Sequence, residues 1–134
     1  MSLWRMSAAV VLLPTLVGCV HCEYRVIQEA RSPDGARNAV AYGSMCGGMV
    51  SNATHVSILR PGARAKGRSN LFAGSMTEPD AVRGPYGGPN VAIRWRGNDT
   101  LEVDYDTSAS VWRQDRVRGV AVVYGVIPTR KKQP

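Results

Sequence analysis

The chain has 134 residues, of which 44% are hydrophobic and 20% charged, and its formal net charge is +7. This length suits a single domain, and the hydrophobic content excludes an intrinsically disordered protein. The positive charge favours anionic partners such as lipid headgroups or polysaccharide, although a genome that favours arginine would give the same balance. Nucleic acid is not expected as a partner, because the sequence has neither stacking aromatic residues nor a docking motif.

The first 18 residues have the pattern of a secretory signal helix. Arg5 gives the start a positive charge, and residues 6–17 form an uncharged, mostly apolar run. This run is too short to span about 30 Å of hydrocarbon as a helix, so a signal peptide is favoured over a membrane anchor. The four residues 16–19 (LVGC) then resemble the lipobox of bacterial lipoprotein signal peptides.

The lipobox resemblance implies cleavage before Cys19 and attachment of diacylglycerol to its thiol, with residues 19–22 as a lipidated linker. It places the protein in a bacterial cell envelope, held to the membrane by lipid. Val20 stands where Asp often signals retention at the inner membrane, which favours the periplasmic face of an outer membrane where one exists. The alternatives are an uncleaved anchor, or an ordinary signal peptide with Cys19 free to form a disulfide.

Cys22 and Cys46 remain once Cys19 is set aside, and an even pair in an exported chain is a candidate disulfide. Two free thiols are the alternative. A structural zinc site is not expected, because only His21 and His55 could assist the cysteines and the spacing is unfamiliar. No other metal site and no cofactor is predicted.

Residues 23–127 read as a β domain, because short runs with period-two alternation are separated by turn residues. We expect strands near residues 23–30, 36–42, 54–60, 91–96, 100–106, 110–112 and 120–126, and residues 71–73 could form a further short one. The sequence of residues 32–35 (SPDG) predicts a tight turn between the first two strands. The fold class is therefore all-β, a small antiparallel sandwich or open barrel of about six or seven strands. Residues 128–134 are expected to form a basic, disordered tail.

The hairpin of residues 91–106 allows two registers. Apolar residues must face apolar ones, so pairing Trp95 with Leu101 sets Arg94 opposite Glu102. A shift of two residues sets Arg96 opposite Glu102 instead. Trp95 and Trp112 are both expected to pack in the core.

Several short motifs follow one another in a particular order along residues 31–126. They are Ser32-Pro33-Asp34-Gly35, Cys46-Gly47, Val56-Ser57-Ile58, Ile93-Arg94-Trp95, Leu101-Glu102-Val103 and Val122-Val123-Tyr124. This order resembles a family of small, uncharacterised exported bacterial proteins. The resemblance implies export and brings with it no activity and no functional residues.

Glu102, Asp104 and Asp106 alternate along one strand and form an acidic stripe. Such a stripe could bind Ca²⁺ or supply the two carboxylates of a glycoside hydrolase. The simpler interpretation is cross-strand pairing with Arg94 and Arg96. His55 lies on a strand with no partner that its spacing identifies, so no catalytic residue is assigned.

Two segments are candidate binding sites. Tyr86, within the Gly- and Pro-rich residues 84–89, could contact a sugar or a partner, unless that loop is simply disordered. Arg64, Lys66 and Arg68 could contact anionic lipid or an envelope protein, unless they are only solvated.

We therefore expect a non-enzymatic envelope lipoprotein whose β domain binds an envelope component or protein. A hydrolase of envelope polymer that uses the acidic stripe, an inhibitor of a foreign hydrolase and a purely structural lipoprotein are the alternatives.

Overall fold

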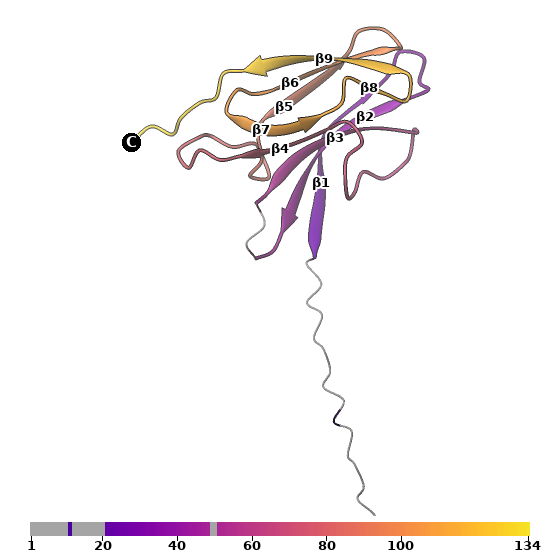
Figure 1. The fold of residues 1–134 in the computed structure, drawn as a ribbon. Helices are drawn as coiled ribbons and strands as arrows, with labels where there is room; N and C mark the ends of the chain where they lie inside the picture. The colour runs from indigo at the N-terminus through magenta and orange to yellow at the C-terminus, as the bar shows by residue number, and fades with distance from the viewer. Residues whose placement is uncertain (1–10, 12–20, 49–50) are drawn as a thin grey trace, which may run out of the picture.

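The computed structural model describes residues 11, 21–48 and 51–134, and the predicted signal helix and Cys19 lie outside these residues. Nine β-strands occur in the described residues, and their arrangement confirms the all-β sandwich (Figure 1). The strands are β1 (Cys22–Arg31), β2 (Asn38–Cys46), β3 (Ala53–Leu59), β4 (Phe72–Met76), β5 (Val91–Trp95), β6 (Thr100–Asp106), β7 (Ala109–Arg113), β8 (Arg116–Val117) and β9 (Val120–Ile127).

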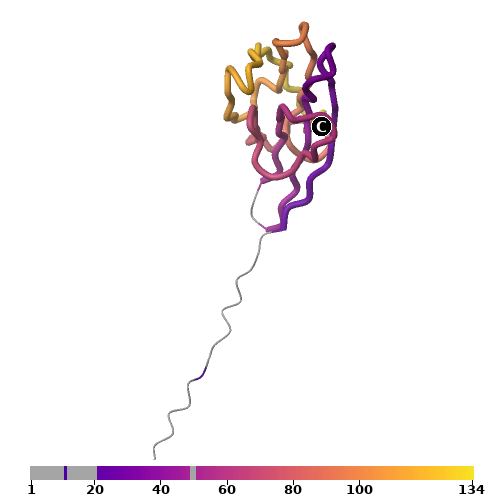
Figure 2. The backbone as a smooth tube through the Cα atoms, turned by 90° about the vertical axis from the view of Figure 1, so that its right-hand side faces the viewer, coloured from indigo at the N-terminus to yellow at the C-terminus, as the bar shows by residue number. Residues whose placement is uncertain are grey.

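Two sheets make up the sandwich, a five-stranded one in the order β1-β2-β3-β4-β7 and a four-stranded one in the order β5-β6-β9-β8. The N-terminal strand (indigo) and the C-terminal strand (yellow) lie on opposite sides of the domain (Figure 2). The expectation of an entirely antiparallel domain is wrong at one pair, because β6 and β9 are parallel. After β6 the chain crosses to the other sheet as β7 and returns through β8, so β9 enters beside β6 in the same direction.

Alternating apolar residues from both sheets form the core between them. Val56 and Ile58 of β3 face Leu101 and Val103 of β6, and all four side chains are fully buried. Burying a side chain of this size stabilises the fold by about 1.5–3 kcal/mol relative to leaving it exposed. Because side chains alternate along a strand, burying these residues in the core places their neighbours on the outward faces of the sheets.

The turn at residues 32–35 forms as predicted and joins β1 to β2. The N–H of Gly35 donates to the carbonyl of Ser32 (2.8 Å), and Gly35 has a φ of 72°, which suits glycine. The Asp34 carboxylate accepts hydrogen bonds from the Ser32 hydroxyl (2.6 Å) and the Ala36 N–H (3.1 Å). These bonds lower the pKa of Asp34, the bond from Ser32 most of all.

The hairpin of β5 and β6 takes the first of the two predicted registers. Trp95 pairs with Leu101, and Arg94 pairs with Glu102. The Arg94 Nε lies 2.7 Å from the Glu102 carboxylate, which also forms an ion pair with Arg96. The Glu102 carboxylate therefore pairs with both Arg94 and Arg96, the two arginines that the alternative registers place opposite it.

Residues 77–90 connect β4 to β5 without a named strand, but they pack against the domain. Gly88 and Pro89 are buried, and the Arg83 guanidinium donates to the carbonyls of Met76 and Gly87. The interpretation of this segment as simple disorder therefore does not hold.

The tail of residues 128–134 differs from the expectation of a disordered segment. The carbonyl of Arg130 accepts from the N–H of Val82, and the N–H of Lys132 donates to the carbonyl of Asp80, both at 2.7 Å. Lys131 forms a β-bridge with Ala81 between them. These backbone hydrogen bonds do not depend on side-chain type, which is why the basic composition of the tail did not predict them.

Candidate functional site

The face of the five-stranded sheet that turns away from the four-stranded sheet is called the outer face here. Side chains of successive residues alternate across a sheet, so the neighbours of the core residues point to this face. Strand register sets Tyr42, His55, Ala73 and Trp112 in one row across β2, β3, β4 and β7. Trp112 is 46% exposed, which makes its predicted place in the core wrong.

A cavity of about 440 Å³ opens on the outer face. Tyr24, Ser44 and Cys46 of the first two strands form one wall, and Ala73 and Trp112 form the other. His55 lies between these walls, and Arg68 and Ser69 enter from the loop that follows β3. The cavity therefore combines largely apolar walls with a few polar groups, as small-molecule sites commonly do.

His55 is the polar centre of the cavity. Its Nε2 lies 2.9 Å from the Ser44 hydroxyl, and its Nδ1 lies 3.2 Å from the Ser69 hydroxyl. The imidazole also stacks on the Tyr42 ring, with 5.0 Å between centroids and 18° between planes. Burial lowers the pKa of His55, which favours the neutral ring.

A serine hydroxyl bonded to a histidine suggests a nucleophile and its base, but the third member of this set does not suit that chemistry. In a catalytic triad the third group stabilises the imidazolium that forms when the histidine takes the proton. Here that position holds the uncharged Ser69 hydroxyl, and burial further disfavours the charged ring. The arrangement is better suited to holding two hydroxyl groups in place than to proton transfer.

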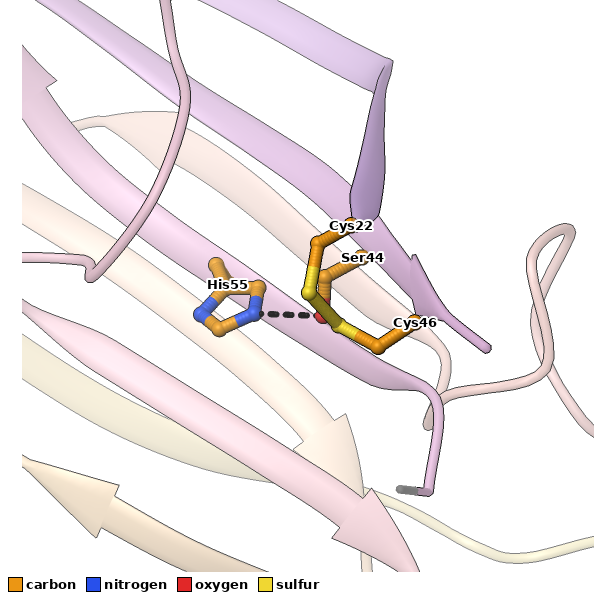
Figure 3. Close-up of a disulfide and its surroundings, with 4 residues drawn as sticks. All are labelled: Cys22, Ser44, Cys46 and His55. Atoms are coloured by element: carbon orange, nitrogen blue, oxygen red, sulfur yellow. Dashed lines mark hydrogen bonds between the residues drawn. A yellow bond between two sulfur atoms is a disulfide. The ribbon is translucent and has the colours of Figure 1, made fainter. Parts of the chain in front are cut away.

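Cys22 and Cys46 form a disulfide at the first residue pair of β1 and β2, with 4.1 Å between their Cα atoms. The predicted pairing is therefore confirmed. Figure 3 shows the disulfide beside Ser44 and His55, with the bond between these two drawn as a dashed line. Since Cys46 also lines the cavity, the disulfide fixes part of the cavity rim to β1.

The structure separates the two predicted binding segments. Arg68 lines the cavity, and Arg64 and Lys66 lie exposed on the same loop. Tyr86 instead packs against Gly43, where an added Cβ would lie 2.7 Å from the Tyr86 Cβ. Gly43 belongs to the inward-facing residues of β2, so Tyr86 is not part of the outer face.

The acidic stripe does not form one site. Glu102 is bound by both arginines, and Asp104 lies beside it in a depression that Arg94 also lines. Asp106 is 1% exposed and lies in a separate pocket with Asn90, which donates to it. The cross-strand pairing that the sequence predicted for Glu102 is therefore confirmed.

Sequence reasoning missed the grouping of Ser44, His55, Ser69 and Trp112. The alternation of β3 does set His55 opposite the apolar face, which is a usable signal. The two serines carry no such signal, because one comes from a neighbouring strand and the other from a loop.

Among the residues that the structure describes, no group of three or more metal-ligating side chains gathers in one place. The same residues include no helix that is long and apolar enough to cross a membrane. Neither a protein-family model, nor a curated protein, nor a solved structure matches this chain.

Proposed function

We propose that the protein is a lipid-anchored, non-enzymatic binding module of the bacterial cell envelope, and that the outer-face cavity is its ligand site. The observation that carries this proposal is the cavity itself. It offers apolar walls, hydroxyl groups oriented by His55 and a tryptophan that is only half covered. Exposed aromatic surface beside a few fixed polar groups is typical of recognition sites.

Binding is favoured over catalysis because the possible catalytic groups are already engaged or unsuited. His55 has no carboxylate behind it in its hydrogen-bonded set. Glu102 is neutralised by two arginines, and this lowers its pKa, mainly through the hydrogen bond from Arg94. A glycoside hydrolase would instead need one carboxyl group with a raised pKa to act as the acid.

The location in the envelope rests on the lipobox that ends at Cys19. Mass measurement of the mature protein should show cleavage before Cys19 and the added acyl chains. A Cys19→Ser variant should leave the membrane fraction, because acyl chains contribute about 0.8 kcal/mol for each buried CH₂. Retention of the serine variant in washed membranes would contradict the anchor.

The ligand site can be tested by filling the cavity. Ala73→Phe should place a ring between His55 and Trp112, whereas Ala92→Phe puts the same ring on an exposed strand position of the other sheet. Tryptophan fluorescence would be followed while lipid, polysaccharide and protein fractions of the envelope are added separately. One fraction should change the fluorescence of the wild type and of A92F but not of A73F. An equal response of all three proteins, or none from any fraction, would contradict the proposal.

A further inference from the structure

The proposed lipid anchor at Cys19 is close in sequence to Cys22, whose disulfide partner lines the cavity. Cys22 is the first residue of β1, and it is bonded to Cys46, which lines the cavity. Cys19 precedes Cys22 by three residues, and three residues of fully extended chain span no more than about 11 Å. The start of β1 and the end of β2 pair at one end of the domain (Figure 1). A chain anchored at Cys19 therefore cannot carry this rim of the cavity far from the bilayer.

The outer face also has the charge that an anionic bilayer attracts. The loop between β3 and β4 carries Arg60, Arg64, Lys66 and Arg68, and it contains no acidic residue. This loop lies over the outer face, since the Tyr42 hydroxyl donates to the carbonyl of Gly67 at 3.1 Å. Among the described residues that line the cavity, Arg68 is charged and none is acidic.

The exposed aromatic residue on this face fits the same partner. Tryptophan gathers at membrane interfaces because its ring is apolar and its N–H is polar. Trp112 lies on the same wall as Ala73, opposite Tyr24. A protein surface with cations and a half-exposed tryptophan suits the headgroup region of a bilayer better than its apolar interior.

We propose that the outer face rests on the membrane to which the chain is tethered, and that its cavity takes the headgroup of an anionic phospholipid. This inference rests on the proposed lipid anchor and names the ligand of the proposed site. The basic loop supplies the attraction, Trp112 enters the headgroup layer, and Arg68, which lines the cavity, meets the phosphate.

The test uses the lipidated protein reconstituted into vesicles of phosphatidylcholine, with or without phosphatidylglycerol. Trp4 is removed with the signal peptide, so a W95F background leaves Trp112 as the reporter. Lipids brominated near the headgroup quench Trp112 when it enters the interface. Quenching should appear only with phosphatidylglycerol. It should fall at molar salt, where the screening length is about 3 Å.

Two charge-reversed triple variants distinguish the effect of the basic loop on the outer face from the effect of net charge alone. R64E/K66E/R68E should lower the affinity for phosphatidylglycerol by more than tenfold, since each cation near such a surface contributes about fivefold. R130E/K131E/K132E changes the net charge equally but alters the tail, and it should leave the quenching nearly unchanged. Equal quenching in both vesicle types, or equal effects of the two variants, would overturn the inference.

Sedimentation with pure phosphatidylcholine vesicles reports on the anchor alone. A protein that sediments with these vesicles without quenching in phosphatidylglycerol retains the anchor and refutes the membrane-facing surface. A protein that fails to sediment with them refutes the anchor itself.

Discussion

The side chain of Gln28 pairs with the backbone of Ile93 as a strand would. Its Nε2 donates to the Ile93 carbonyl at 2.9 Å, and its Oε1 accepts from the Ile93 N–H at 3.1 Å. A bulge in β1 between Val26 and Gln28 shifts the register at this point. One amide group thus links the edge of the five-stranded sheet to the edge of the four-stranded sheet.

Replacing Gln28 by Ala should weaken the sandwich, because both backbone groups of Ile93 lose their partners. An unsatisfied, partly buried polar group costs about 1–3 kcal/mol, so the free energy of unfolding should fall by that order. Urea denaturation measures this difference. Gln114→Ala is the matched control, since Gln114 is exposed and contributes backbone groups to its hydrogen bonds. An equal loss in both variants would show that the Gln28 amide has no special role.

Removing the disulfide should destabilise the domain by about 3.5 kcal/mol on the chain-entropy estimate for a closed loop of this size. Cys22 and Cys46 are 24 residues apart, and their bridge restricts the unfolded chain. The double variant C22A/C46A should unfold at lower urea than the oxidised wild type. Reductant should then shift the wild type toward the variant and leave the variant unchanged. A wild type that does not respond to reductant would contradict the predicted effect.

Stability should depend on the protonation of His55. Burial lowers the pKa of His55 below its ordinary 6.5, so the unfolded chain binds the proton more tightly than the folded one. The stabilisation is therefore complete above pH 6.5 and is lost as the pH falls from there toward the folded pKa. One proton limits the slope to about 1.4 kcal/mol per pH unit.

The free energy of unfolding would be measured from about pH 7.5 to about pH 5.5 for the wild type, H55Q and H21Q. H55Q should lose part of the slope. H21Q should keep it, because His21 lies exposed ahead of the first strand. Parallel curves for the wild type and H55Q would exclude His55 as the cause.

Two glycines outside the left-handed region offer a direct test of how tightly the loop after β4 packs. A Cβ on Gly88 would lie 2.6 Å from the backbone nitrogen of Thr54, whereas a Cβ on Gly47 would meet nothing within 4 Å. Gly88→Ala should therefore cost about 1–3 kcal/mol through overpacking, and Gly47→Ala should be nearly neutral. Thermal unfolding of the two variants compares them. A stable G88A protein would mean that this loop does not close on β3 in solution.

The parts of the fold that sequence predicted are those fixed by local chemistry. The turn at residues 32–35 is held largely by hydrogen bonds among residues 32–37. Alternation within the 16 residues of the β5–β6 hairpin narrows its register to two possibilities, and the structure takes the first. The parallel pairing of β6 with β9 depends on a crossover through the other sheet, which alternation does not encode. Trp112 was misplaced for a similar reason. Its strand lies at the edge of a sheet, where an outward residue has fewer neighbours to cover it.

The candidate site was harder to predict than the fold. Its residues range from Tyr24 to Trp112, and only strand order brings them together. Cys46 and Arg68 were predicted as a disulfide partner and a binding residue, each on separate grounds. Their meeting at one cavity follows from the hydrogen bonds of the β3–β4 loop, which leave no periodic trace in the sequence.

The position of β9 at the end of the chain bears on the export that we propose for this protein. Val120 and Val122 are buried members of the core, and they belong to the final strand. Until that strand emerges, β6 lacks its parallel neighbour and the core lacks these two side chains. Contacts between distant parts of a chain also form slowly. A polypeptide that cannot complete its core early stays unfolded for longer, which is the state that the proposed export through a narrow channel would require.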